Sequence, residues 1–181
     1  MLARFLVFMV LILSVAACAP KGENYQTTDL TGAGPGALSR DARMLVAVEG
    51  DGKYVDKSYP GSGWMTRDAM IAALSAYTPT VAKVPGPATV NRAKASALKQ
   101  NMDFLIYLKI LHWEERTTEW SGKPDRIKID IRLIDGKTGD AIESRIIEAS
   151  TTHSTWLGDH PQDLLIKPFE DYAAGLFGSP T

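Results

Sequence analysis

The segment 103–114, with the sequence DFLIYLKILHWE, constrains the fold more than any other part of this chain. Successive side chains of an extended strand point to opposite faces of a sheet. The two faces of this segment would carry Phe104, Ile106, Leu108 and Ile110 on one side, and Leu105, Tyr107 and Leu111 on the other. Because both faces are apolar, both must be covered, and we predict a strand in the centre of a sheet.

Four further segments predict strands around this one. Residues 43–48 (RMLVAV) form a short apolar run before a Glu-Gly-Asp-Gly turn, and residues 80–84 end at a Pro-Gly-Pro sequence. Residues 127–133 alternate Ile or Leu with charged residues, which is typical of a strand with one wet face. The loop 135–140 (DGKTGD) then predicts a hairpin that returns as a strand over 141–150.

Three segments predict helices. Thr66 is a candidate N-cap for a helix that ends near Tyr77, and residues 90–101 are rich in Ala and Lys. Pro161 suits the first turn of a C-terminal helix, which Pro168 should break or kink and restart. The apolar stripes are Met70, Ala73, Leu74 and Tyr77 in the first helix and Leu165, Phe169, Tyr172 and Leu176 in the last. The predicted order β-α-β-α-β-β-β-α indicates a single α/β (α+β) domain with helices packed on a mixed sheet.

The N-terminus has the layout of a secretory signal. Arg4 precedes an apolar run from Phe5 to Val15, and the small residues Ala16 and Ala17 follow. The run is shorter than the roughly 20 residues that cross a bilayer. Val-Ala-Ala-Cys at 15–18 resembles the lipobox of bacterial lipoproteins, which are acylated on the cysteine and cleaved before it. We therefore expect a signal peptide over 1–17 and a lipid, such as palmitate, on Cys18, the single cysteine of the chain.

The rest of the chain divides into a tether and one domain. Residues 18–41 are rich in Gly, Thr and Pro without apolar periodicity, so we predict a flexible tether, followed by a globular domain over 42–181. The residue after the cysteine is Ala19. An Asp at this position would favour retention in the inner membrane, so Ala19 points to the periplasmic face of the outer membrane. The net charge of −1 gives no electrostatic reason to bind nucleic acid.

Motifs for catalysis or cofactor binding are weak in this sequence. The three histidines, His112, His153 and His160, make no HxH or HxxxH pair, so we predict no metal site and no cofactor. Ser62 lies between two glycines, but its context does not match the hydrolase elbow GxSxG. The sequence therefore does not predict an enzyme.

A binding surface is the better-supported prediction. The densest polar and aromatic stretch is 111–125 (LHWEERTTEWSGKPD), and a second polar loop covers 156–163. Trp at the ends of predicted elements anchors interfaces and can also stack on sugar rings, or it can pack under loops. The candidate surface consists of Trp113, Glu115, Glu119, Trp120, Trp156 and His160.

Three motifs carry a resemblance to a known family. They are Tyr59-Pro60-Gly61-Ser62-Gly63 with Met65-Thr66, the stretch from Leu111 to Asp125, and Gly158-Asp159-His160-Pro161-Gln162-Asp163-Leu164-Leu165. Over about 43–177 the chain resembles the Gram-negative lipoproteins grouped as domain of unknown function 4823. The resemblance implies a lipoprotein but no activity.

Two functional hypotheses follow. The first is a non-catalytic, membrane-anchored periplasmic module that binds a protein of the cell envelope. The second is a domain that binds, or less plausibly cleaves, peptidoglycan or a surface polysaccharide, with Trp stacking and the carboxylates Glu115 and Glu119 as the motivating features.

Overall fold

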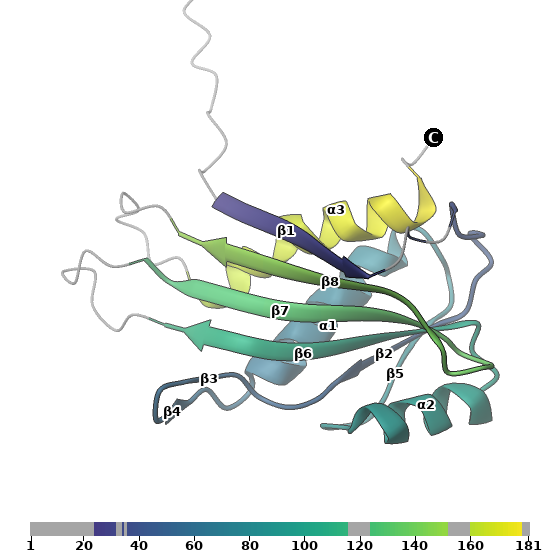
Figure 1. Ribbon diagram of the computed structural model, residues 1–181, viewed down its shortest axis with the longest axis horizontal. Helices are drawn as coiled ribbons and strands as arrows, with labels where there is room; N and C mark the ends of the chain where they lie inside the picture. The colour runs from purple at the N-terminus through teal and green to yellow at the C-terminus, as the bar shows by residue number, and fades with distance from the viewer. Residues whose placement is uncertain (1–23, 32–33, 35, 116–123, 152–159, 179–181) are drawn as a thin grey trace, which may run out of the picture.

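Six strands form one mixed sheet in the order β1-β8-β7-β6-β2-β5, shown in Figure 1. The computed structural model describes residues 24–31, 34, 36–115, 124–151 and 160–178. The sheet strands are β1 (Asn24–Thr31), β2 (Met44–Val48), β5 (Val81–Lys83), β6 (Phe104–Glu114), β7 (Arg126–Asp135) and β8 (Ala141–Ser150). β2 is parallel to both β5 and β6, whereas the pairs β6–β7, β7–β8 and β8–β1 are antiparallel. The strand predicted to be central, β6, is therefore paired on both sides.

Helices cover both faces of the sheet. α1 (Ser62–Ser75) and α3 (Ile166–Phe177) share one apolar core with the sheet, while α2 (Val90–Lys99) packs on the opposite face. A short 3₁₀ turn, η2 (Pro161–Leu165), leads into α3, so the chain restarts as an α-helix close to Pro168. None of the helices in the described ranges is long and apolar enough to span a bilayer. The predicted α+β domain, with a mixed sheet and packed helices, is confirmed.

Strand β1 lies inside the segment predicted as a flexible tether, and this part of the prediction is wrong. Its residues NYQTTDLT pair along the outer edge of β8, from Asn24 opposite Ser150 to Thr31 opposite Ser144. The sequence signal was missing because an edge strand gains its stability from backbone hydrogen bonds and needs no apolar alternation. Tyr25 is the exception, since it packs against the core.

The first helix begins five residues earlier than predicted. Gly61 precedes α1 with a left-handed φ of 93°, and the Thr66 hydroxyl, buried inside the helix, donates to the Ser62 carbonyl at 2.8 Å. Thr66 is therefore not the cap. The predicted apolar face is correct for Met70, Ala73 and Leu74, which are all buried.

Between β2 and α1 the chain adds a small hairpin that the sequence did not predict. β3 (Lys53–Tyr54) pairs with β4 (Lys57–Ser58), and Figure 1 shows the hairpin beside the carboxyl end of β6.

A bulge in β6 changes which face its last residues occupy. Ile110 is paired with Ile129 and His112 with Lys128, so Leu111 is the extra residue and is exposed rather than buried with Leu105 and Tyr107 as predicted. After the bulge, Trp113 joins the same core as Ile106 and Leu108. The bulge therefore directs the end of β6 toward the α1 and α3 side.

Candidate functional site

A cleft of about 320 Å³ lies at the carboxyl end of β6. It is formed by three segments that are far apart in the sequence: the β4–α1 connection, the end of β6, and the start of η2. Its lining residues are Lys57, Ser58, Tyr59, Pro60, Ser62, Met65, Trp113, Glu115, His160 and Gln162. All three motifs that carry the family resemblance contribute to this one cleft.

The wall formed by residues 59–63 is held by buried backbone contacts. The Ser62 hydroxyl donates to the Tyr59 carbonyl at 2.7 Å and accepts from the Gly52 N–H at 2.8 Å. Both interactions are with backbone groups, and no base is bonded to this hydroxyl among the residues the structure describes. Ser62 therefore fixes the loop and is not arranged as a nucleophile.

Trp113 forms the floor of the cleft and belongs to the core, with only 3% of its surface exposed. The loop above it fits closely, because a Cβ added to Gly52 would lie 2.5 Å from the Trp113 Cβ. The indole face is thus covered by protein and does not offer a stacking surface. The prediction that Trp113 is part of an exposed binding surface is corrected to a supporting role beneath it.

Glu115 and His160 provide the polar groups at the rim. The His160 Nδ1 lies 3.3 Å from the Glu115 Oε1, and both side chains are partly open to solvent. The Glu115 N–H donates to the Tyr59 hydroxyl at 3.3 Å, while the His160 N–H donates to the Asp163 carboxylate at 3.0 Å. The structure therefore brings these two predicted residues together across the cleft.

A second carboxylate–imidazole pair lies next to the first one. The His112 Nε2 lies 3.3 Å from the Oε2 of Glu114, whose side chain is buried. The ring of Tyr54, from β3, contacts the His112 ring edge-on with centroids 4.7 Å apart. His112 thereby connects the β3–β4 hairpin to β6.

The remaining predicted site residues, Glu119, Trp120 and Trp156, lie outside the described residues. Conversely, the sequence did not single out Tyr59, Lys57 or Gln162 as site residues. Tyr59 was quoted only as part of a motif, and nothing in the local sequence indicates that its hydroxyl reaches the end of β6.

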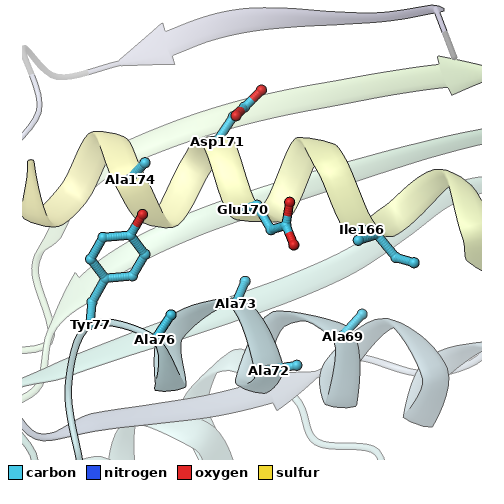
Figure 2. Close-up of a pocket in the computed structure, with 9 residues that line it drawn as sticks. All are labelled: Ala69, Ala72, Ala73, Ala76, Tyr77, Ile166, Glu170, Asp171 and Ala174. Carbon is cyan, nitrogen blue, oxygen red and sulfur yellow. The ribbon is translucent and has the colours of Figure 1, made fainter. Parts of the chain in front are cut away.

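A larger hollow of about 430 Å³ lies between α1 and α3, and Figure 2 shows its lining. Ala69, Ala72 and Ala73 of α1, with Ala76 directly after it, face Ile166, Glu170 and Ala174 of α3, and Tyr77 lies at one end. This hollow contains none of the predicted site residues, and its polar lining consists of the carboxylates of Glu170 and Asp171 and the phenol of Tyr77. The cleft at the end of β6 is the better candidate, because its polar groups converge.

The chemistry available in the cleft is hydrogen bonding and charge. One carboxylate, one imidazole, one phenol and the ammonium group of Lys57 face it or form its rim. Within the described ranges, no three His, Cys, Asp or Glu side chains are grouped to hold a metal ion. Such a mixed polar rim over an apolar floor suits the recognition of another molecule.

The chain belongs to the family of domain of unknown function 4823 (DUF4823), which it matches over residues 37–176. No curated protein matches it. Its fold is similar to that of the PelC dodecamer from Paraburkholderia phytofirmans, with a TM-score of 0.64 and 16% identity over 88% of this chain and 100% of that chain. The DUF330 protein XCC0632 from Xanthomonas campestris has a TM-score of 0.49 and 11% identity, over 80% of this chain and 89% of that chain. Lipoprotein GNA1162 from Neisseria meningitidis has a TM-score of 0.46 and 16% identity, over 74% of this chain and 98% of that chain.

Proposed function

We propose that this protein is a lipid-anchored lipoprotein of the bacterial envelope that binds a partner protein through the cleft at the end of β6. The observation that carries the proposal is the convergence of three separate motifs on one cleft whose hydroxyl, Ser62, is occupied by backbone bonds. An activated nucleophile would be hydrogen-bonded to a base, whereas the Ser62 hydroxyl is bonded to backbone groups. Here the exposed groups are a carboxylate and an imidazole paired with each other.

The cleft supports a protein partner better than a glycan. Sugar recognition commonly uses an exposed aromatic face, and the aromatic side chains that line this cleft, Tyr59 and Trp113, are both buried. Glycan binding would therefore depend on other tryptophans, namely the exposed Trp64, or Trp120 and Trp156. Charged and hydrogen-bonding groups such as Glu115, His160 and Lys57 are typical of the polar part of a protein interface.

Site-specific photocrosslinking in living cells tests the partner. A photoreactive residue at Gln162 faces the cleft without disturbing the Glu115–His160 pair, and a control probe at Lys137 lies in the β7–β8 hairpin at the other end of the sheet. We expect a discrete adduct from position 162 only, which Glu115→Lys weakens. Identical adducts from both positions, or none from position 162, would contradict the proposal.

The lipid anchor has an independent test. Cys18→Ser should abolish incorporation of labelled palmitate and leave uncleaved precursor, while normal processing of this variant would refute the anchor. We propose the periplasmic face of the outer membrane as the location, since Ala19 follows the cysteine. Fractionation of membranes should then find the protein with outer-membrane markers, and Ala19→Asp should move it to the inner membrane.

A second copy of the chain is an alternative partner. The similar fold of PelC occurs in a dodecamer, which supports self-assembly as a candidate function for this chain. Light scattering on the purified lipidated protein in detergent would distinguish the two. A single assembly of defined size favours self-association, whereas a monomer favours a different partner.

A further inference from the structure

The chain enters the domain at the same end as the cleft. Asn24, the first residue of β1, is paired with Ser150, which is paired with Arg126, which in turn is paired with Glu114 at the end of β6. Asn24 is only six residues from Cys18. Six residues reach at most about 20 Å, since an extended chain advances roughly 3.3–3.6 Å per residue.

This short reach determines which end of the domain can approach a membrane. A ten-residue strand such as β7 is about 33 Å long at 3.3 Å per residue. The opposite end of the sheet is therefore farther from Asn24 than the segment between Cys18 and Asn24 can reach. With β1 in the sheet and a lipid on Cys18, the end that carries the cleft is the end held closest to the bilayer. This step relies on the proposed lipid anchor.

The same end carries several exposed apolar side chains. Within the described ranges, the large apolar residues exposed there are Tyr54, Val55, Trp64 and Leu111. Val55 is the most exposed of them, with 79% of its surface accessible, and it forms the tip of the β3–β4 hairpin. In Figure 1 the hairpin and the N-terminal end of β1 lie at the same end of the sheet, on opposite sides of it.

The hairpin tip has the chemistry of a bilayer interface. Two exposed lysines, Lys53 and Lys57, flank Tyr54 and Val55, with Asp56 as the single acid of the turn. Basic residues beside an aromatic and an aliphatic side chain bind anionic headgroups and the acyl boundary together. Val55 also has a φ of 53°, a left-handed conformation that is costly for a β-branched residue.

We propose that the β3–β4 hairpin touches the bilayer to which the lipid anchor holds the protein, with Val55 at the deepest point. The occupant of this apolar surface is thus a lipid surface rather than a protein. The contact provides a second, weaker attachment to the membrane in addition to the lipid chains. It also restricts the orientation of the domain. The cleft then lies close to the membrane, where it can reach a membrane-embedded partner.

Fluorescence quenching in vesicles tests this contact. The full lipidated chain would be reconstituted in vesicles of phosphatidylethanolamine and phosphatidylglycerol, with a polarity-sensitive dye on Val55→Cys. Because Cys18 is acylated, the introduced thiol is the single reactive one. Leu98→Cys is the matched control, since Leu98 is also an exposed apolar residue (62%) and lies near the C-terminal end of α2, close to the start of β6. Lipids with a quencher on the acyl chain should quench the dye at position 55 and leave position 98 unchanged.

The outcomes separate the anchor from the hairpin contact. Vesicle flotation of the wild type, with Cys18→Ser as the negative control, first reports on the anchor itself. If the wild type floats and the dye at position 55 is no more quenched than the dye at position 98, the hairpin contact is overturned and the anchor stands. If the wild type fails to float, the proposed anchor is the part that fails. The double variant Lys53→Glu, Lys57→Glu should reduce the quenching at position 55 without reducing flotation. Unchanged quenching would show that the two lysines do not attract the hairpin to the anionic lipids.

Discussion

The two ends of the sheet each contain one non-glycine residue with a φ of 53°, the two such residues in the described ranges. At the cleft end it is Val55, in the exposed turn between β3 and β4. At the opposite end it is Asn101, just after α2 and before β6. Asn tolerates the left-handed conformation and often ends helices, whereas a β-branched residue is strained there. At the opposite end, Asn101 thus suits its backbone conformation, whereas Val55 at the cleft end does not.

Other contacts at the two ends follow the same division. At the Asn101 end, the Asp103 carboxylate accepts from the Arg43 N–H at 3.0 Å and forms an ion pair with the Arg43 guanidinium, which lies 3.2 Å away. The Asp135 carboxylate accepts two backbone N–H groups of the β7–β8 turn at 2.8 Å, and these bonds lower its pKa. At the cleft end, two carboxylate–imidazole pairs lie near the exposed side chains of Tyr54 and Val55. We interpret the first as the end built for stability and the second as the end built for contact.

Trp113→Ala should give the largest loss of stability. It tests whether Trp113, at the cleft end of the sheet, is part of the core. Removal of a buried Trp costs about 3–5 kcal/mol of unfolding free energy, which urea denaturation would measure. Trp64→Ala is the matched control, since Trp64 is exposed, and it should change stability by about 0.5 kcal/mol or less. Equal effects of the two substitutions would show that Trp113 is not the floor of the cleft.

Gly136→Ala tests the close packing of the β7–β8 hairpin against the start of β6, at the end of the sheet opposite the cleft. A Cβ on Gly136 would lie 2.2 Å from the Met102 carbonyl oxygen, so the β7–β8 hairpin would have to move away from the start of β6. We expect a loss of about 2 kcal/mol or more in thermal or urea unfolding. Gly175→Ala, in α3 with open space around it, should instead stabilise the protein by roughly 0.5–1 kcal/mol. A neutral Gly136→Ala would mean that this end is looser than its contacts indicate.

Asp103→Asn has a smaller effect that depends on pH. The Arg43 side chain, followed by its backbone N–H, lowers the pKa of Asp103 to about 2. Because the folded pKa is below the unfolded value, this stabilisation is complete above about pH 4 and is lost as the pH falls toward 2. We expect Asp103→Asn to cost about 1 kcal/mol at pH 7, as for a partly exposed ion pair.

The control for this titration is Asp140→Asn, an exposed aspartate at the same end of the sheet. The two variants should differ at neutral pH and converge near pH 2, as measured by urea unfolding across the pH range. A difference that persists unchanged at pH 2 would show that the charge of Asp103 is not the source of the stability.

Periodicity predicted the elements that form the core, from β2 to α3. It succeeded where burial imposes a pattern, as in the alternating isoleucines of β7 and the stripe of Leu165, Phe169, Tyr172 and Leu176 in α3, all of which are buried. It failed for β1, whose polar residues are ordered by the edge of a strand more than a hundred residues away. Local sequence carries no signal for such pairing.

For the site, the sequence identified the residues but not their arrangement. Glu115 and His160 were both predicted, yet they are 45 residues apart in the chain, and only the fold brings them within 3.3 Å. The bulge at Leu111 places Trp113 in the core, which strict alternation could not predict. The structure therefore brings Glu115 and His160 together and shows that Trp113 is buried, while the contact surface itself stays a prediction.

Val55→Gly should give the smallest change in stability, and in the opposite direction. Glycine adopts a φ of 53° without steric cost, so the substitution relieves the strain of a β-branched side chain and should raise the unfolding free energy by about 0.5–1 kcal/mol after the entropy of the unfolded glycine is subtracted. Asn101→Gly, at the same φ, should gain less, because Asn already tolerates this conformation. Urea unfolding of both variants measures the difference.

The same variant separates stability from contact. If Val55 is retained for the bilayer, Val55→Gly becomes more stable in solution, yet its hairpin binds the vesicle surface less, which a dye on Tyr54→Cys would report as reduced quenching. A variant that gains stability and keeps full quenching would show that the rest of the hairpin, including Lys53 and Lys57, is sufficient for the contact. A variant that loses stability would contradict the reading of Val55 as strained, and with it the contrast between the two ends of the sheet.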